Sequence, residues 1–228
     1  MTLLEDFKEF DFEALEKQAD RMRCDKCGAS VKWFCCHCLV SFVPLPQVHL
    51  SIPLTILKDE REKDGKSTAV HAALLAPNST RVISVNVREF EEQIDPSCVI
   101  LFPGKDSVPV DSVDWTSVAS VVVIDGTWSQ AASVNRLSSL SHLKRVHLSE
   151  SHRTLFWRYQ DWGEHCLSTI EAIYYLYKEI AVKQAEFAFE HSERLLYLFA
   201  FFYMMIQKTY KEANRSFTPK HRPNYILP

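Results

Sequence analysis

Five of the seven cysteines lie between positions 24 and 38, in the stretch C-D-K-C-G-A-S-V-K-W-F-C-C-H-C. The stretch holds two C-x-x-C turns, Cys24 with Cys27 and Cys35 with Cys38. Each such turn places two thiolates on one side of a tight loop, and two turns complete a tetrahedral zinc site with no open position. Closed sites are structural, so metal binding would supply folding energy. The spacing therefore predicts a small zinc module with these four ligands.

Other interpretations of the cysteine cluster are less consistent with the sequence. Disulfides are disfavoured because no secretory signal opens the chain: Glu5, Asp6 and Glu9 stand where a cationic region and an apolar run would be needed. A redox C-x-x-C would not need a second copy nearby. Either Cys36 or His37 could replace one of the four ligands, and the spacing leaves that alternative open.

Composition limits the rest of the chain. With 228 residues, of which 46% are hydrophobic and 12% aromatic, it is long enough for one or two packed domains and is not disordered. Its five glycines form neither G-x-G-x-x-G nor a Walker loop. The longest apolar run, 195–206, is shorter than the roughly 20 residues of a membrane span. We expect a soluble intracellular protein of the nucleus or cytoplasm, with no membrane contact.

Short apolar segments alternate with longer amphipathic ones. We predict strands at 54–58, 82–87, 98–102, 119–124 and 143–148, and helices at 3–23, 67–75, 128–140, 169–182 and 184–210. This alternation favours an α/β fold with a mostly parallel sheet and helices on both faces. The predicted organisation is an N-terminal helix (1–23), the zinc module (24–41), an α/β domain (42–210) and a basic tail (211–228).

Ligands of parallel sheets bind beyond the carboxyl ends of the strands, and three turns there carry polar residues. One follows strand 98–102, one begins at Asp125 after a buried strand, and one precedes the helix at 169. The pairs Thr127/Gln130 and Ser168/Glu171 also fit helix capping boxes. Asp125 suits catalysis or cation binding at the mouth of a strand, or an ordinary turn. Trp128 suits either a core or a stacking platform.

Five motifs resemble those of the DTW-domain family, the tRNA-uridine aminocarboxypropyltransferases. The Asp-x-Thr-Trp motif that names the family stands at 125–128. Lys66-Ser67-Thr68, the turn at 101–104 and Ser168-Thr169-Ile170-Glu171-Ala172 match in order. The N-terminal cysteine knuckles make the eukaryotic type-1 branch the most similar.

The resemblance implies an enzyme that uses S-adenosylmethionine and is related to the SPOUT methyltransferases, with a trefoil-knotted sheet. It also implies transfer of the 3-amino-3-carboxypropyl group to N3 of a tRNA uridine, in the D-loop, with release of methylthioadenosine. Such a transfer depends mainly on presenting one electrophilic carbon in line with the uracil nitrogen. No protein nucleophile or phosphate loop is required.

The family motifs assign candidate roles. Asp125 is the catalytic candidate, as a base for the uracil N–H or as an orienting group. The candidate cofactor pocket contains Leu101, Phe102, Pro103, Gly126, Thr127, Trp128, Ser168, Thr169 and Glu171. The candidate tRNA contacts are Lys66, Ser67, Arg153, Phe156 and Arg158, in keeping with RNA recognition by cations and stacking aromatics. The zinc module also carries basic residues, so its removal should weaken tRNA binding more than cofactor binding.

Two other functions share these features. A SPOUT-type tRNA methyltransferase would use the same pocket with the cofactor turned round. A non-enzymatic zinc-containing RNA-binding protein would keep the fold and lose the chemistry. The intact motif residues favour the transferase.

Overall fold

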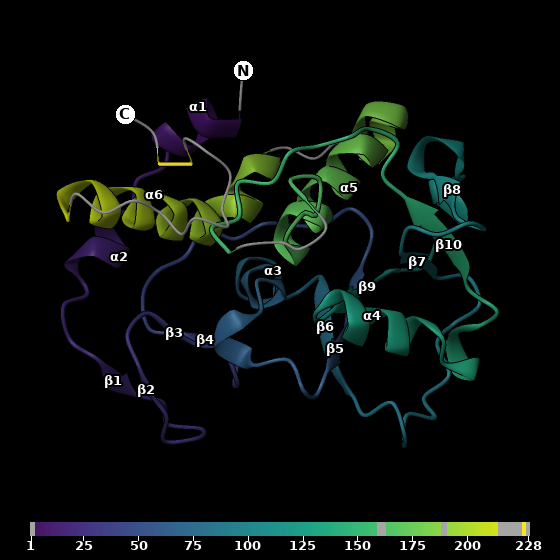
Figure 1. Ribbon diagram of the computed structural model, residues 1–228, viewed down its shortest axis with the longest axis horizontal. Helices are drawn as coiled ribbons and strands as arrows, with labels where there is room; N and C mark the ends of the chain where they lie inside the picture. Colours follow the sequence, from purple (N-terminus) through teal and green to yellow (C-terminus); the bar gives the residue numbers. More distant parts are fainter. Residues whose placement is uncertain (1–2, 159–162, 188–190, 214–224, 227–228) are drawn as a thin grey trace.

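A computed structural model describes residues 3–158, 163–187, 191–213 and 225–226. At its centre lies a six-stranded sheet in the order β6-β5-β9-β7-β10-β8, with every pair of neighbouring strands parallel (Figure 1). Its strands are β5 (Leu54–Asp59), β6 (Thr80–Val85), β7 (Val99–Leu101), β8 (Val108–Pro109), β9 (Val121–Asp125) and β10 (Lys144–His147). The predicted parallel α/β sheet is confirmed.

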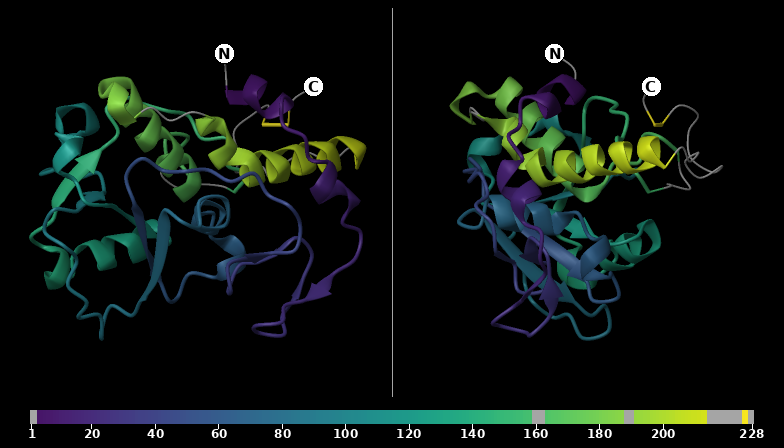
Figure 2. Two further views of the ribbon diagram at one scale, coloured as in Figure 1. Left: turned by 180° about the vertical axis from the view of Figure 1, so that it is seen from behind. Right: turned by 90° about the vertical axis from the view of Figure 1, so that its left-hand side faces the viewer.

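Helices cover both faces of this sheet, as the two views of Figure 2 show. The α-helices are α1 (Leu3–Lys8), α2 (Glu13–Lys17), α3 (Ala69–Leu75), α4 (Trp128–Asn135), α5 (Thr169–Lys183) and α6 (Tyr197–Glu212). The 3₁₀ turns are η1 (Asp64–Lys66), η2 (Val110–Ser112), η3 (Trp115–Ser117), η4 (Ser138–Leu140), η5 (Ala185–Phe187) and η6 (Ser192–Leu196).

Strand β9 shows why two layers form. Its side chains alternate between two cores: Val121 and Val123 join residues of α3, α5 and α6, whereas Val122 and Ile124 join residues of α4. Each fully buried aliphatic side chain contributes about 1.5–3 kcal/mol. A strand that is apolar on both faces is typical of a buried parallel sheet.

The cysteine module consists of two short antiparallel pairs, β1 (Met22–Arg23) with β2 (Ser30–Val31) and β3 (Phe34–Cys35) with β4 (Val40–Ser41). Each C-x-x-C turn is followed by a left-handed residue: Gly28 has φ 71° and Leu39 has φ 53°. Glycine favours this conformation and leucine pays a steric penalty for it. The two turns therefore share one backbone form although only one has glycine.

Two helix predictions are wrong. Residues 3–23 form two short helices and β1, because Phe10 and Phe12 both pack on Tyr197, and residues two apart cannot lie on one face of a helix. The predicted helix 184–210 begins only at Tyr197. Gln184 is extended and His191 is left-handed with φ 55°, so the helix cannot run through them.

Phe7 of α1 and Tyr225 both join the core that contains residues of α5 and α6. Within the described ranges, no helix is long and apolar enough to cross a membrane.

Much of the predicted basic tail, 214–224 and 227–228, lies outside the described residues. Tyr225 is buried, accepts a hydrogen bond from Gln207 Nε2 at its carbonyl (2.9 Å) and donates to the carbonyl of Leu155 (2.5 Å).

Candidate functional site

A cavity of roughly 1230 Å³ lies beyond the carboxyl ends of β5, β7 and β9. Its size is sufficient for a drug-sized ligand together with part of a nucleotide. The predicted residues that line it are Lys66, Ser67, Leu101, Phe102, Pro103, Asp125, Gly126, Thr127, Trp128, Phe156, Arg158, Ser168 and Thr169. Three turns that are distant in the sequence therefore meet at one site. This agrees with the strand-end rule, that ligands of parallel sheets bind beyond the carboxyl ends of the strands.

Asp125 ends β9 and is only 2% exposed. Its Oδ1 accepts a hydrogen bond from Thr169 Oγ1 at 2.8 Å, and its Oδ2 has no partner among the described residues. The buried Ser67 Oγ, on the same cavity, likewise has none there. Burial raises the pKa of Asp125, and the Thr169 hydroxyl, the Lys58 charge and the Ser67 hydroxyl oppose the rise; Ser67 Oγ is close enough to lower the pKa but does not meet hydrogen-bond geometry with the carboxylate. An unpaired buried carboxylate oxygen facing a cavity suits a ligand that brings a hydrogen-bond donor or a cation.

The Thr127/Gln130 capping box shapes the turn after Asp125. The Thr127 amide donates to Gln130 Oε1 at 2.7 Å, and the Gln130 amide donates to Thr127 Oγ1 at 3.4 Å. Gly126 lies under this box: a Cβ there would meet the Cβ of Gln130 at 3.1 Å and that of Asp59 at 3.5 Å. Glycine allows the turn to approach both neighbours.

Glu171 does not line the cavity; it lies buried behind it at 0% exposure. It accepts four hydrogen bonds: from Thr154 Oγ1 (2.7 Å), the Leu155 amide (2.7 Å), the Ser168 amide (2.8 Å) and Ser168 Oγ (2.7 Å). Burial raises its pKa, and these donors oppose the rise. Its carboxyl therefore ties the segment before Phe156 to the start of α5.

Aromatic and apolar side chains form another wall. Phe102 packs edge-on against Trp128 with ring centroids 6.5 Å apart, and Trp128 is 38% exposed. Phe156 is buried against Phe199 but still reaches the cavity. Trp128 therefore lies at the surface on the cavity wall and not in the core, where its ring is accessible to a ligand.

The turn after β5 also lines the cavity, and the sequence predictions missed most of it. Arg61, Glu62 and Lys63 lie on this wall. The Arg61 guanidinium makes two hydrogen bonds to the buried Asp59, 2.8 Å to Oδ1 and 2.6 Å to Oδ2, and the Arg61 amide adds a third at 2.9 Å to Oδ1; together they hold the pKa of Asp59 below its ordinary value. The strand-end rule applied to 54–58 would have found this turn.

Two predicted tRNA contacts differ in position. Arg158 lies on the cavity and donates to the carbonyls of Lys66 (2.9 Å) and Gly65 (3.2 Å), so it also braces the loop before α3. Arg153 does not line the cavity and pairs with Glu164 at 2.5 Å.

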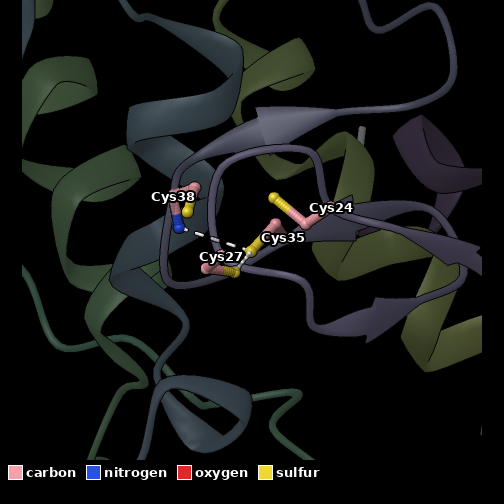
Figure 3. Close-up of side chains that lie close together, drawn as sticks. All are labelled: Cys24, Cys27, Cys35 and Cys38. Carbon is pink, nitrogen blue, oxygen red and sulfur yellow. Dashed lines mark hydrogen bonds between the residues drawn. The ribbon is translucent and has the colours of Figure 1, made fainter.

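The four cysteines form a second candidate site, in which their sulfurs turn toward one another (Figure 3). The Sγ atoms of Cys24, Cys27, Cys35 and Cys38 lie within 4.8 Å of one another. With Zn–S bonds of about 2.3 Å, a tetrahedral site requires sulfurs about 3.8 Å apart, and Cys27 and Cys35 are 3.6 Å apart. The donor set therefore fits zinc.

The thiols of this cluster differ in acidity. The Cys27 backbone amide lowers the pKa of Cys24 to about 7, whereas burial raises that of Cys38 to about 12. A metal would hold all four as thiolates. His37 instead contacts Asp64, and Cys36 is outside the quartet.

Comparison with known proteins gives the family. The DTW domain model matches residues 21–207. The chain belongs to the DTW-domain family. The tRNA-uridine aminocarboxypropyltransferase 1 of Rattus norvegicus is 33% identical, over 90% of this chain and 82% of its own length. Its Homo sapiens counterpart is 28% identical, over 86% and 81%. The predicted family is confirmed, and these relatives are named as transferases. No solved structure matches the chain.

Proposed function

We propose that this DTW-domain protein transfers the 3-amino-3-carboxypropyl group from S-adenosylmethionine to N3 of a tRNA uridine, in the D-loop, and releases methylthioadenosine. The observation that carries the proposal is the position of Asp125: it ends a buried strand, inside a ligand-sized cavity, with one oxygen unpartnered among the described residues. The names of the homologous transferases support the same reaction.

Two carboxyl groups that line the cavity among its basic residues support a donor with cationic groups. These are Asp125 and Glu62, and burial together with the Asp125 charge raises the pKa of Glu62. A ligand that carries a sulfonium and an ammonium group would favour the ionised form of both carboxyls. Leu101, Phe102 and Pro103 offer an apolar wall for a flat heterocycle.

S-Adenosylmethionine would supply an electrophilic γ-carbon with a neutral thioether as leaving group. The new bond joins that carbon to uracil N3, and the old carbon–sulfur bond breaks. Asp125, with its raised pKa, would accept the N3 proton or face the developing charge. Thr169 holds the other oxygen of that carboxyl, so the group is oriented before the substrate arrives.

The rim of the cavity supports a polyanionic second substrate. Arg61, Lys63, Lys66 and Arg158 line it, and cations contribute most of the sequence-independent affinity for nucleic acid. Trp128 would stack a base presented from an unpaired loop. We also propose that Arg153 contacts tRNA farther from the cavity, and that the protein acts in the nucleus or cytoplasm.

We further propose that Cys24, Cys27, Cys35 and Cys38 bind a structural zinc ion, which would lock the two knuckles together. We propose in addition that the protein is related to the SPOUT enzymes and shares their trefoil knot. Because knots are almost absent from other folds, this part of the proposal depends on the family resemblance.

Mass spectrometry of nucleosides tests the reaction. Unmodified tRNA is incubated with the protein and S-adenosylmethionine, then digested. The proposal expects a uridine heavier by one aminocarboxypropyl group and an equal amount of methylthioadenosine. A methylated uridine would indicate a SPOUT-type methyltransferase. Unchanged tRNA from folded, zinc-loaded protein that binds tRNA would favour the RNA-binding module.

A further inference from the structure

The second cysteine knuckle contacts the cavity wall that follows β5. His37, which lies between two of the cysteines, places Nδ1 3.3 Å from Asp64 Oδ2. The other oxygen of Asp64 pairs with Lys58 Nζ at 2.9 Å. Asp64 therefore bridges the knuckle to the end of a central strand.

Lys58 connects Asp64 to the turn that lines the cavity. Its side chain is only 13% exposed, and its Nζ also donates to the Glu62 carbonyl at 2.7 Å. In the sheet, Lys58 is the direct partner of Asp125 on β9. The same lysine thus fixes the fold of the turn that carries Glu62 and faces the strand that ends in Asp125.

A second contact joins the module to α3, the helix that follows this wall. The Phe34 ring meets His71 edge-on with centroids 6.1 Å apart, and His71 stacks on Phe202 of α6 at 5.8 Å. Burial lowers the pKa of His71 to about 3, so its ring packs in the neutral form. Ser67 and Thr68, immediately before α3, line the cavity. The cysteine module therefore contacts the wall at Asp64 and the helix that follows the wall at His71.

We infer that the four-cysteine module is a positioning element of the donor cavity, with Asp64 as the positioning residue that transmits its order to the wall 58–68. The inference rests on the proposed function for the identity of the donor. It differs from a role confined to gripping RNA, because it expects disruption of the bridge to weaken binding of S-adenosylmethionine measured in the absence of tRNA.

The test compares Asp64→Ala with Glu60→Gln, which removes an exposed acid from the same turn that does not line the cavity. Calorimetry measures the Kd of S-adenosylmethionine, elemental analysis measures bound zinc, and filter binding measures tRNA affinity. We expect Asp64→Ala to raise the Kd of S-adenosylmethionine about fivefold or more with zinc content retained, and to weaken tRNA binding only as far as the basic residues of the same wall contribute to it; Glu60→Gln should match the wild type. Wild-type donor affinity in zinc-loaded Asp64→Ala would overturn the inference.

Hydrogen exchange separates this inference from the proposed reaction. In Asp64→Ala, and in wild-type protein treated with a zinc chelator, deuterium uptake should rise across 58–68 and stay unchanged in β10, which β9 and β7 separate from β5 in the sheet. This readout needs no donor. If the wild type fails to bind S-adenosylmethionine but 58–68 responds, the reaction is wrong and the positioning role stands. Unchanged uptake in 58–68 refutes the positioning role whatever the ligand.

Discussion

The cysteine module and the donor cavity are built in opposite ways. The module takes its four ligands from 24–38, so two tight turns suffice to assemble it. The cavity takes its walls from turns that the fold brings together; the Ile170 amide, for example, donates to Thr68 Oγ1 across 102 residues of sequence. A local site is specified by spacing, whereas a composite site is specified by strand order. Variants that damage one should therefore differ in kind from variants that damage the other.

The largest expected effect is the loss of a zinc ligand. Cys35→Ser should cost more metal affinity than the roughly 10–100-fold that loss of an outer-shell partner costs, and it should unfold the module, because metal binding is its folding energy. Zinc competition with a chromogenic chelator measures this. Cys36→Ser is the matched control; if it lost zinc and Cys35→Ser kept it, the quartet would be wrong.

The second effect concerns the cavity. Asp125→Asn should lower the rate of tRNA modification by about 10²–10⁴-fold, the range of a general base, while zinc content is unchanged. A variant that retained near-wild-type turnover would remove Asp125 from the mechanism.

Asp125→Asn should lower the reaction rate but raise the stability of the fold at neutral pH. The raised pKa of Asp125 means that the folded state holds its proton more tightly than the unfolded chain. Stability therefore falls as pH rises from the ordinary to the raised pKa, and the loss is complete only above the raised pKa. Asp125→Asn removes this cost, so its Tm at neutral pH should exceed that of the wild type, and the gap should close toward acid pH. Thermal scans at several pH values check the sign.

A smaller effect is expected where the cavity is supported from behind. Glu171→Gln replaces a buried carboxyl that accepts four hydrogen bonds, and it should cost about 1–3 kcal/mol of stability and loosen the segment before Phe156. Urea unfolding measures the cost. Glu164→Gln, which breaks an exposed ion pair with Arg153, should stay within about 0.5 kcal/mol. Equal effects of the two would contradict a supporting role for Glu171.

The smallest effect returns to the module. Gly28→Ala places a side chain at φ 71°, with no atom within 4 Å of the new Cβ, so the cost is backbone strain of about 1–2 kcal/mol. Gly104→Ala, which adds a Cβ in equally open space at an ordinary φ, should be nearly neutral. The Tm values of the two zinc-loaded variants are compared. Equal values would show that the first knuckle accommodates a side chain at residue 28 without strain.

The sequence predicted the parallel sheet, both capping boxes and half of the residues that line the cavity, because each of these follows from short-range pattern or from the strand-end rule. The family motif placed Glu171 in the cofactor pocket, whereas its side chain is buried behind the cavity. A motif shows which residues are neighbours in sequence but not which way each side chain turns. The sequence predictions missed Arg61 and Glu62, whose turn has no resemblance to a motif. The contact between His37 and Asp64 depends on how the module docks, which spacing does not encode.

Isotope transfer tests the central claim most directly. The protein is given unmodified tRNA and two samples of S-adenosylmethionine, one with heavy carbon in the aminocarboxypropyl chain and one with heavy carbon in the methyl group. Mass spectrometry then follows each label. The account predicts that the chain label appears on a tRNA uridine, that the methyl label leaves with methylthioadenosine, and that Asp125→Asn suppresses both. A methyl label on tRNA, or transfer undiminished in Asp125→Asn, would contradict it.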